Sequence, residues 1–153
     1  NTILAQKLGL KNIRPLHKED IADEGYFGLG AIGEIEKETD AIEFLKNVKA
    51  ILNIHNIRYV NGKKDKIKTI AICGGSGTDF IDDALRERVD CFLTGDVKYH
   101  QFLDCENRFL LADIGHFESE NFIKEYLFSL LSEKFCNFAN LHLDNSANHI
   151  KNI

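Results

Sequence analysis

The chain has 153 residues, of which 44% are hydrophobic, and a formal net charge of −5. This length suffices for one domain with a substantial core, because chains of this size bury roughly 70% of their unfolded surface. The acidic balance makes nucleic acid an unfavourable partner, since it repels phosphate backbones at long range. No apolar run approaches the roughly 20 residues that a membrane-spanning helix needs.

The beginning of the chain is unusual, because it starts with Asn1, contains no methionine and opens directly in helix-like sequence. We expect that processing or truncation has removed the true start, together with any targeting segment. The first predicted element is a short amphipathic helix from Ile3 to Leu10, closed by Gly9.

The next elements are two strands with a helix between them. The stretch EGYFGLGAIGEI predicts a glycine-punctuated strand, and the apolar spacing of residues 41–54 predicts a helix. A short strand is predicted at Ile57–Val60. The lysines at positions 63, 64, 66 and 68 follow it, and we interpret them as a solvated turn because no aromatic residues interleave with them.

From residue 67 onward the alternation of strands and helices becomes regular. Short apolar runs predict buried strands at Ile67–Cys73, Cys91–Thr94 and Phe109–Ala112. Helical segments follow them at residues 79–88, 97–105 and 115–134, and a last strand is predicted at 141–143. This order predicts a single α/β unit over residues 1–153, with a mixed or mainly parallel sheet covered by helices.

The four cysteines are widely spaced, and no Cys-x-x-Cys motif occurs among Cys73, Cys91, Cys105 and Cys136. Three of them lie in or beside apolar runs. This pattern favours buried thiols in a reducing compartment over disulfides or a zinc ribbon. We therefore expect a cytoplasmic protein.

Polar turns follow the three central strands, where ligands of such sheets usually bind. The first turn, CGGSGTDF, offers backbone N–H groups to a phosphate, or else is a structural turn in which Ser76 and Asp79 form a capping box. In the second turn, Asp96 and His100 are candidate cleft residues. Their alternative roles are a helix cap and a surface histidine.

The third turn carries the strongest candidates, His116 and Glu120. They are four residues apart at the start of a predicted helix, so both project from one helical face. The same face continues with Ile123, Leu127 and Leu130, which predicts that the pair points into the protein or a pocket. An imidazole and a carboxylate one turn apart can chelate a divalent cation. Alternatively, His116 caps the helix and Glu120 complements its dipole.

The segment IAICGGSGTDFIDDALRERVDCFLTGDVKYHQF, followed by LLADIGHFESE, resembles the type-2 GTP cyclohydrolase I homologues, also called the Nif-three-like family. The shared features are an apolar strand ending in GGSG, a TGD-xx-YH turn and a D-x-GH-xxxE motif, in the same order and at similar spacing. Weaker resemblance at NTILAQKLGL, GLGAIGEI and NSANHIKNI extends it over essentially the whole chain.

The resemblance implies an intertwined Nif-three-like fold, of which this chain is the C-terminal part and which is incomplete without an N-terminal half. It implies two divalent metal ions per intact subunit, of zinc, manganese or iron. His116 and Glu120 would be ligands, and the N-terminal half would supply the others. It also implies self-assembly into ring-like hexamers built from dimers.

Two functions follow from this resemblance. The first is a metal-dependent, hydrolase-like activity on a nucleotide or another phosphorylated small molecule. In that case the metals activate water, and Asp96 and His100 support the ligands or transfer protons. The second is a non-catalytic, ring-shaped scaffold that binds protein partners or nucleic acid.

Overall fold

The computed structural model describes residues 1–18, 28–135 and 148–150. The strands in this part of the chain are β1 (Lys11–Arg14), β2 (His17–Lys18), β3 (Gly28–Leu29), β4 (Ala31–Asp40), β5 (Arg58–Val60), β6 (Lys66–Ile72), β7 (Cys91–Thr94) and β8 (Leu110–Asp113). The helices are α1 (Thr2–Lys7), α2 (Ala41–Ile51), α3 (Ile81–Arg86), α4 (Tyr99–Cys105), α5 (His116–Glu120) and α6 (Ile123–Lys134), with a 3-10 helix η1 (Thr78–Phe80) before α3.

The strands form a six-stranded sheet in the order β1-β4-β6-β7-β8-β5, and β2 and β3 form a separate two-stranded sheet. The three central strands β6, β7 and β8 are parallel. The other three pairings, β1 with β4, β4 with β6 and β5 with β8, are antiparallel. The predicted α/β class is therefore confirmed, and the sheet is mixed. The predicted strand at residues 141–143 lies outside the described residues.

The core has two layers, one on each face of the sheet. Along β7, Cys91 and Leu93 belong to the layer formed with α1 and α2, whereas Phe92 belongs to the layer formed with α3 and α4. All four residues of β7 and of β8 are buried. This explains why the central strands read as continuous apolar runs in the sequence, since both of their faces are covered.

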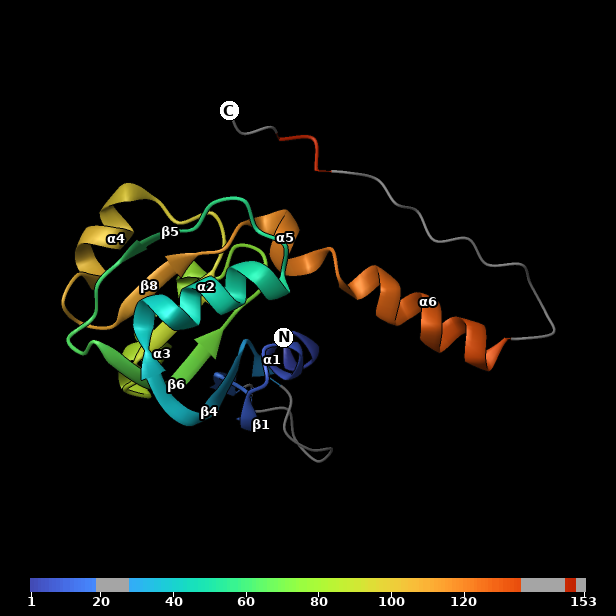
Figure 1. Cartoon of the computed structure of the whole chain (residues 1–153), viewed down its shortest axis with the longest axis horizontal. Helices are drawn as coiled ribbons and strands as arrows, with labels where there is room; N and C mark the ends of the chain where they lie inside the picture. Colours follow the sequence, from blue (N-terminus) through green and yellow to red (C-terminus); the bar gives the residue numbers. More distant parts are fainter. Residues whose placement is uncertain (19–27, 136–147, 151–153) are drawn as a thin grey trace.

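The predicted helix over residues 115–134 is wrong in two respects. It is interrupted at Asn121 and Phe122, which separate α5 from α6. Phe122 packs against the core layer of α1 and α2, but no residue of α6 is buried. Leu127 and Leu130 are 47% and 46% exposed, and α6 extends away from the sheet (Figure 1). The apolar stripe of α6 therefore faces solvent in the described part of the chain.

The thiols of Cys73, Cys91 and Cys105 are free and buried, as predicted, whereas Cys136 lies outside the described residues. Burial raises the pKa of Cys105 to about 11, which keeps this thiol protonated and unreactive at neutral pH. Among the described helices, none has the length and apolarity that crossing a bilayer requires.

Asp90 joins the start of β7 to β6. Its carboxylate accepts hydrogen bonds from the backbone N–H groups of Lys68 and Thr69, both at 3.0 Å, and from Nζ of Lys64 at 2.8 Å. Burial alone would raise the pKa of Asp90, but the hydrogen bonds from Lys64 and from the two backbone N–H groups outweigh burial and lower it.

We expect the ionised Asp90 carboxylate to stabilise the fold in a pH-dependent way. Its contribution is complete above the pKa of the unfolded chain and is lost as the pH falls through the lowered pKa of the folded state. Asp90→Asn should cost about 1–2 kcal/mol near neutral pH, and the difference from the wild type should shrink in acid. Urea unfolding of the wild type and the variant between about pH 7 and pH 2 measures the cost and its pH dependence. A difference in the free energy of unfolding that does not change with pH would contradict the stabilising role of the ionised carboxylate.

Candidate metal centre

The candidate site lies where two neighbouring parallel strands end. β7 and β8 are paired in register, with Thr94 opposite Asp113, so the turns that follow them lie side by side. In the first turn Asp96 adopts the left-handed conformation with φ of 55°, which aspartate tolerates better than most residues. In the second turn Gly115, with φ of 81°, precedes the first residue of α5, His116.

This arrangement places the imidazole of His116 between two carboxylates. Its Nδ1 lies 2.6 Å from Oδ2 of Asp96, and its Nε2 lies 3.3 Å from Oε2 of Glu120. The three side chains are 51–54% exposed. His116 and Glu120 therefore share one helical face, as predicted from their spacing, but this face is open to a cavity and not enclosed in the core.

Both carboxylates act on the imidazole electrostatically. The hydrogen bond to Asp96 is the largest cause of a raised His116 pKa, the charge of Glu120 adds to it, and burial opposes it. When Nδ1 carries a proton, this N–H donates a hydrogen bond to Oδ2 of Asp96, and Nε2 is directed toward Glu120. A carboxylate that fixes the ring of a metal-binding histidine in this way is a recurrent feature of metal sites.

The two atoms that face each other, Nε2 of His116 and Oε2 of Glu120, have a separation that also fits a shared cation. Two atoms bound to one zinc ion at about 2.1 Å and a near-tetrahedral angle lie roughly 3.4 Å apart, and the observed distance between Nε2 of His116 and Oε2 of Glu120 is 3.3 Å. No cluster of three or more His, Cys, Asp or Glu side chains suited to a metal ion occurs within residues 1–18, 28–135 and 148–150. His116 and Glu120 would therefore supply two of the four ligands that a structural zinc ion usually has.

Gly75, in the turn after β6, lies directly against this pair. Its φ is +67°, and a Cβ atom there would lie 2.5 Å from Oε1 of Glu120 and 3.4 Å from Cε1 of His116. The positive φ favours glycine at this position, and a larger residue would also push the Glu120 carboxylate away from its present place beside His116.

Three N–H groups of the GGSG turn donate hydrogen bonds within the protein, and that of Gly74 donates to Oδ1 of Asn1 at 2.8 Å. Gly75 N donates to Oγ of Ser119 and Gly77 N donates to Oγ1 of Thr94, both at 2.9 Å. They are therefore not available to cradle a phosphate. Neither is the predicted capping box present, because Gly77 precedes η1 and no side chain caps it. The turn binds β6 to the end of β7 and to α5.

A cavity of about 750 Å³ opens beside the candidate ligands. Its polar lining includes His55, Arg58, Asp96, Asp113, His116 and Glu120. His100 is exposed on α4 and is not among the lining residues. The cavity is therefore lined by Asp96 and the predicted ligand pair, and also by His55 and Arg58, which the sequence did not indicate as site residues.

Arg58 is the main addition to the predicted site, and the structure shows a structural role for Asp113, the aspartate of the D-x-GH-xxxE motif. Asp113 is 8% exposed and accepts hydrogen bonds from the N–H groups of Val97 (3.2 Å) and Gly115 (3.1 Å) and from Nη2 of Arg58. The guanidinium group also donates to the carbonyl of Val97 and lies over the ring of Phe102. Asp113 thus connects both turns that carry the candidate site.

Comparison with known proteins identifies the relatives of this chain. The family model described as Duf34/NIF3 (NGG1p interacting factor 3) matches residues 1–149. A GTP cyclohydrolase 1 type 2 homolog of Staphylococcus aureus (strain MSSA476) is 36% identical over 132 residues, which cover 86% of this chain and 36% of the relative. A protein of the same name from Clostridium perfringens is 36% identical over 121 residues, covering 78% of this chain and 45% of the relative.

A comparison with solved structures also finds similar proteins. The crystal structure of a Staphylococcus aureus hypothetical protein superimposes with a TM-score of 0.77 and 29% identity, covering 89% of this chain and 56% of that protein. The chain thus spans less than half of the two curated relatives. Because the family model matches almost every residue, the chain belongs to the DUF34/NIF3 family.

Proposed function

We propose that the protein binds a divalent metal ion through Nε2 of His116 and a carboxylate oxygen of Glu120, for a hydrolase-like reaction. The substrate class is a nucleotide or another phosphorylated small molecule. The observation that carries the proposal is the 3.3 Å separation of the two ligand atoms on the wall of a 750 Å³ cavity. A bound metal ion would supply a water molecule with a pKa low enough to form a nucleophile near neutral pH.

Asp96 has a separate role in this proposal. By accepting a hydrogen bond from the Nδ1–H of His116, Asp96 holds the ring in the orientation and tautomer that direct Nε2 toward Glu120. His100 stays a candidate for proton transfer, although it does not line the cavity. From the family resemblance we further propose that an N-terminal half supplies the remaining ligands. The same resemblance supports a second metal ion and assembly into hexamers.

The test is the metal content of the intact protein, purified with and without the substitutions His116→Ala and Glu120→Ala. We expect each substitution to weaken metal binding at least tenfold, because each removes one ligand atom. Asp96→Asn should weaken it by about 10- to 100-fold, the usual effect of removing the partner of a ligand histidine. Elemental analysis after dialysis against a weak chelator measures the stoichiometry.

His100→Ala is the matched control, since it removes an exposed histidine next to the same turn but outside the cavity. Its metal content should equal that of the wild type. Wild-type metal stoichiometry in both His116→Ala and Glu120→Ala would contradict the ligand assignment. Nucleotide hydrolysis that survives both substitutions and chelation would contradict the proposed reaction.

The exposed stripe of α6 favours a second candidate function, a scaffold for protein partners. Tyr126, Leu127 and Leu130 are 45–47% exposed on a helix with no buried residue, and contiguous exposed apolar surface is typical of interaction sites. In this case partner binding and assembly of the intact protein would persist in His116→Ala and Glu120→Ala.

A further inference from the structure

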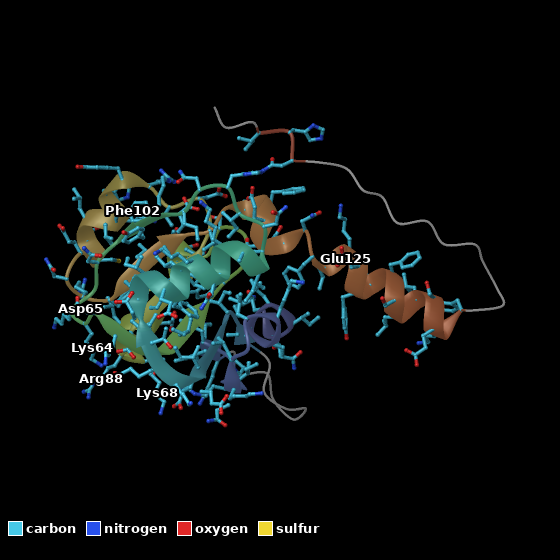
Figure 2. The ribbon with its side chains drawn as sticks, in the orientation of Figure 1. Lys64, Asp65, Lys68, Arg88, Phe102 and Glu125 are labelled. Carbon is cyan, nitrogen blue, oxygen red and sulfur yellow. The ribbon has the colours of Figure 1, made fainter. Side chains whose placement is uncertain are left out.

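A second cavity lies at the other end of the parallel strands, where β7 and β8 begin. Its volume is about 470 Å³. It is bounded by the turn before β6, the turn between α3 and β7, and the turn between α4 and β8. Its charged lining residues are Lys63, Lys64, Arg88, Asp90 and Arg108. Figure 2 shows Lys64 and Arg88 extending from the same side of the molecule, away from α5 and the candidate metal centre.

Four cationic side chains thus meet around one cavity in a chain whose net charge is −5. The single carboxylate, that of Asp90, is engaged by Lys64 and by two backbone N–H groups. In the described part of the chain, Lys63, Arg88 and Arg108 form no ion pair with a carboxylate. The hydrogen bond of Arg108 goes to the backbone carbonyl of Asp104, at 3.4 Å. The cavity therefore has a clear excess of positive charge.

This convergence differs from the solvated turn that the lysine run alone predicts. The cations come from three segments far apart in the sequence, around residues 63, 88 and 108. The floor between them is apolar, because Val89 and Phe109, which are only 5% and 2% exposed, also line the cavity. Low-dielectric walls of this kind strengthen the field of the surrounding charges and attract counter-ions.

We propose that this second cavity binds a phosphate-bearing small anion, independently of the metal centre. Arg88 and Arg108 supply planar groups that can each contact two phosphate oxygens, and Lys63 adds a point charge. The apolar floor formed by Val89 and Phe109 can contact the organic part of a nucleotide. The volume of about 470 Å³ lies within the range of small-molecule sites.

The test is calorimetric titration of the intact protein with pyrophosphate in the presence of a chelator. We expect saturable binding of one anion per chain. The double variant Arg88→Asn/Arg108→Gln should weaken it at least about tenfold, because each lost guanidinium group removes charge-assisted hydrogen bonds. Asparagine is chosen at position 88 because Arg88 has φ of 54°. If this variant does not fold, Lys63→Gln provides a milder test, for which we expect a smaller loss of pyrophosphate affinity.

The matched control is Lys46→Gln/Lys49→Gln, which removes two charges from exposed positions on α2 and should change the affinity less than about twofold. His116→Ala/Glu120→Ala should also leave it unchanged, which separates this site from the metal centre. If a nucleoside diphosphate binds more tightly than pyrophosphate, the apolar floor contacts the nucleoside. If the two affinities are equal, the site recognises the phosphate groups alone. Both results support the proposal. Binding of pyrophosphate that does not saturate would overturn the proposal. So would a loss of affinity in either control as large as that in Arg88→Asn/Arg108→Gln, or tighter binding of a single-stranded oligonucleotide than of pyrophosphate.

Discussion

Asp113→Ala is expected to destabilise the protein by about 2–4 kcal/mol and to loosen the candidate metal centre. The substitution leaves the buried N–H of Val97 and the N–H of Gly115 without their acceptor, and each unsatisfied buried donor costs about 1–3 kcal/mol. These two groups belong to the turns that carry Asp96 and His116. The loss of Asp113 should therefore separate the carboxylate of Asp96 from the imidazole.

Urea unfolding measures the loss of stability, and metal titration of the intact protein measures the loss of the site. Asp113→Asn keeps one acceptor oxygen, so its losses of stability and of metal affinity should both be smaller than those of Asp113→Ala. Asp82→Ala, at an exposed position on α3, is the control and should change the free energy of unfolding by less than about 0.5 kcal/mol. An Asp113→Ala protein as stable as this control would show that the hydrogen bonds to Asp113 do not organise the turns.

The position of the candidate site could be predicted from the sequence because it depends on local patterns. Apolar runs located β7 and β8, and the carboxyl ends of neighbouring parallel strands necessarily lie together. The spacing of four between His116 and Glu120 fixes their common face. The contact between His116 and Asp96 then follows from the pairing of the two strands.

The role of Arg58 could not be predicted in this way. It contacts Asp113 because β5 crosses to the far edge of the sheet and pairs antiparallel with β8, which brings Arg58 opposite Asp113. A three-residue strand carries no local signal of which partner it joins. Similarly, Thr94 and Ser119 are buried polar residues, at 0% and 1% exposure, whose partners in the GGSG turn become visible only in three dimensions.

The outward stripe of α6 shows the limit of helical periodicity. Spacing correctly indicates that Ile123, Leu127 and Leu130 share a face, but it does not say what that face contacts. In the described part of the chain Ile123 is partly buried, but Leu127 and Leu130 further along α6 are exposed. Periodicity predicts which side of a helix is apolar, and only the remaining structure or a partner decides whether it is buried.

Gly95→Ala is expected to cost about 2–3 kcal/mol, toward the upper end of the usual range for overpacking. An added Cβ atom would lie 2.8 Å from the backbone nitrogen of His116, 2.9 Å from the carbonyl oxygen of Gly75 and 3.0 Å from the carbonyl carbon of Gly115. Because all three are backbone atoms, they cannot move aside by changing a rotamer. The turns must separate, and the hydrogen bond from Gly95 N to Gly75 O, now 2.8 Å, should lengthen.

Gly62→Ala is the matched control, because its Cβ atom would also meet backbone, at 2.6 Å from the nitrogen of Leu110. That contact lies at the start of β8, at the opposite end from the candidate metal centre. Both variants should lower the free energy of unfolding in urea, but only Gly95→Ala should also weaken metal binding by the intact protein, because only its clash displaces His116. Equal metal affinity in the two folded variants would mean that ligand geometry does not depend on the close approach of these turns.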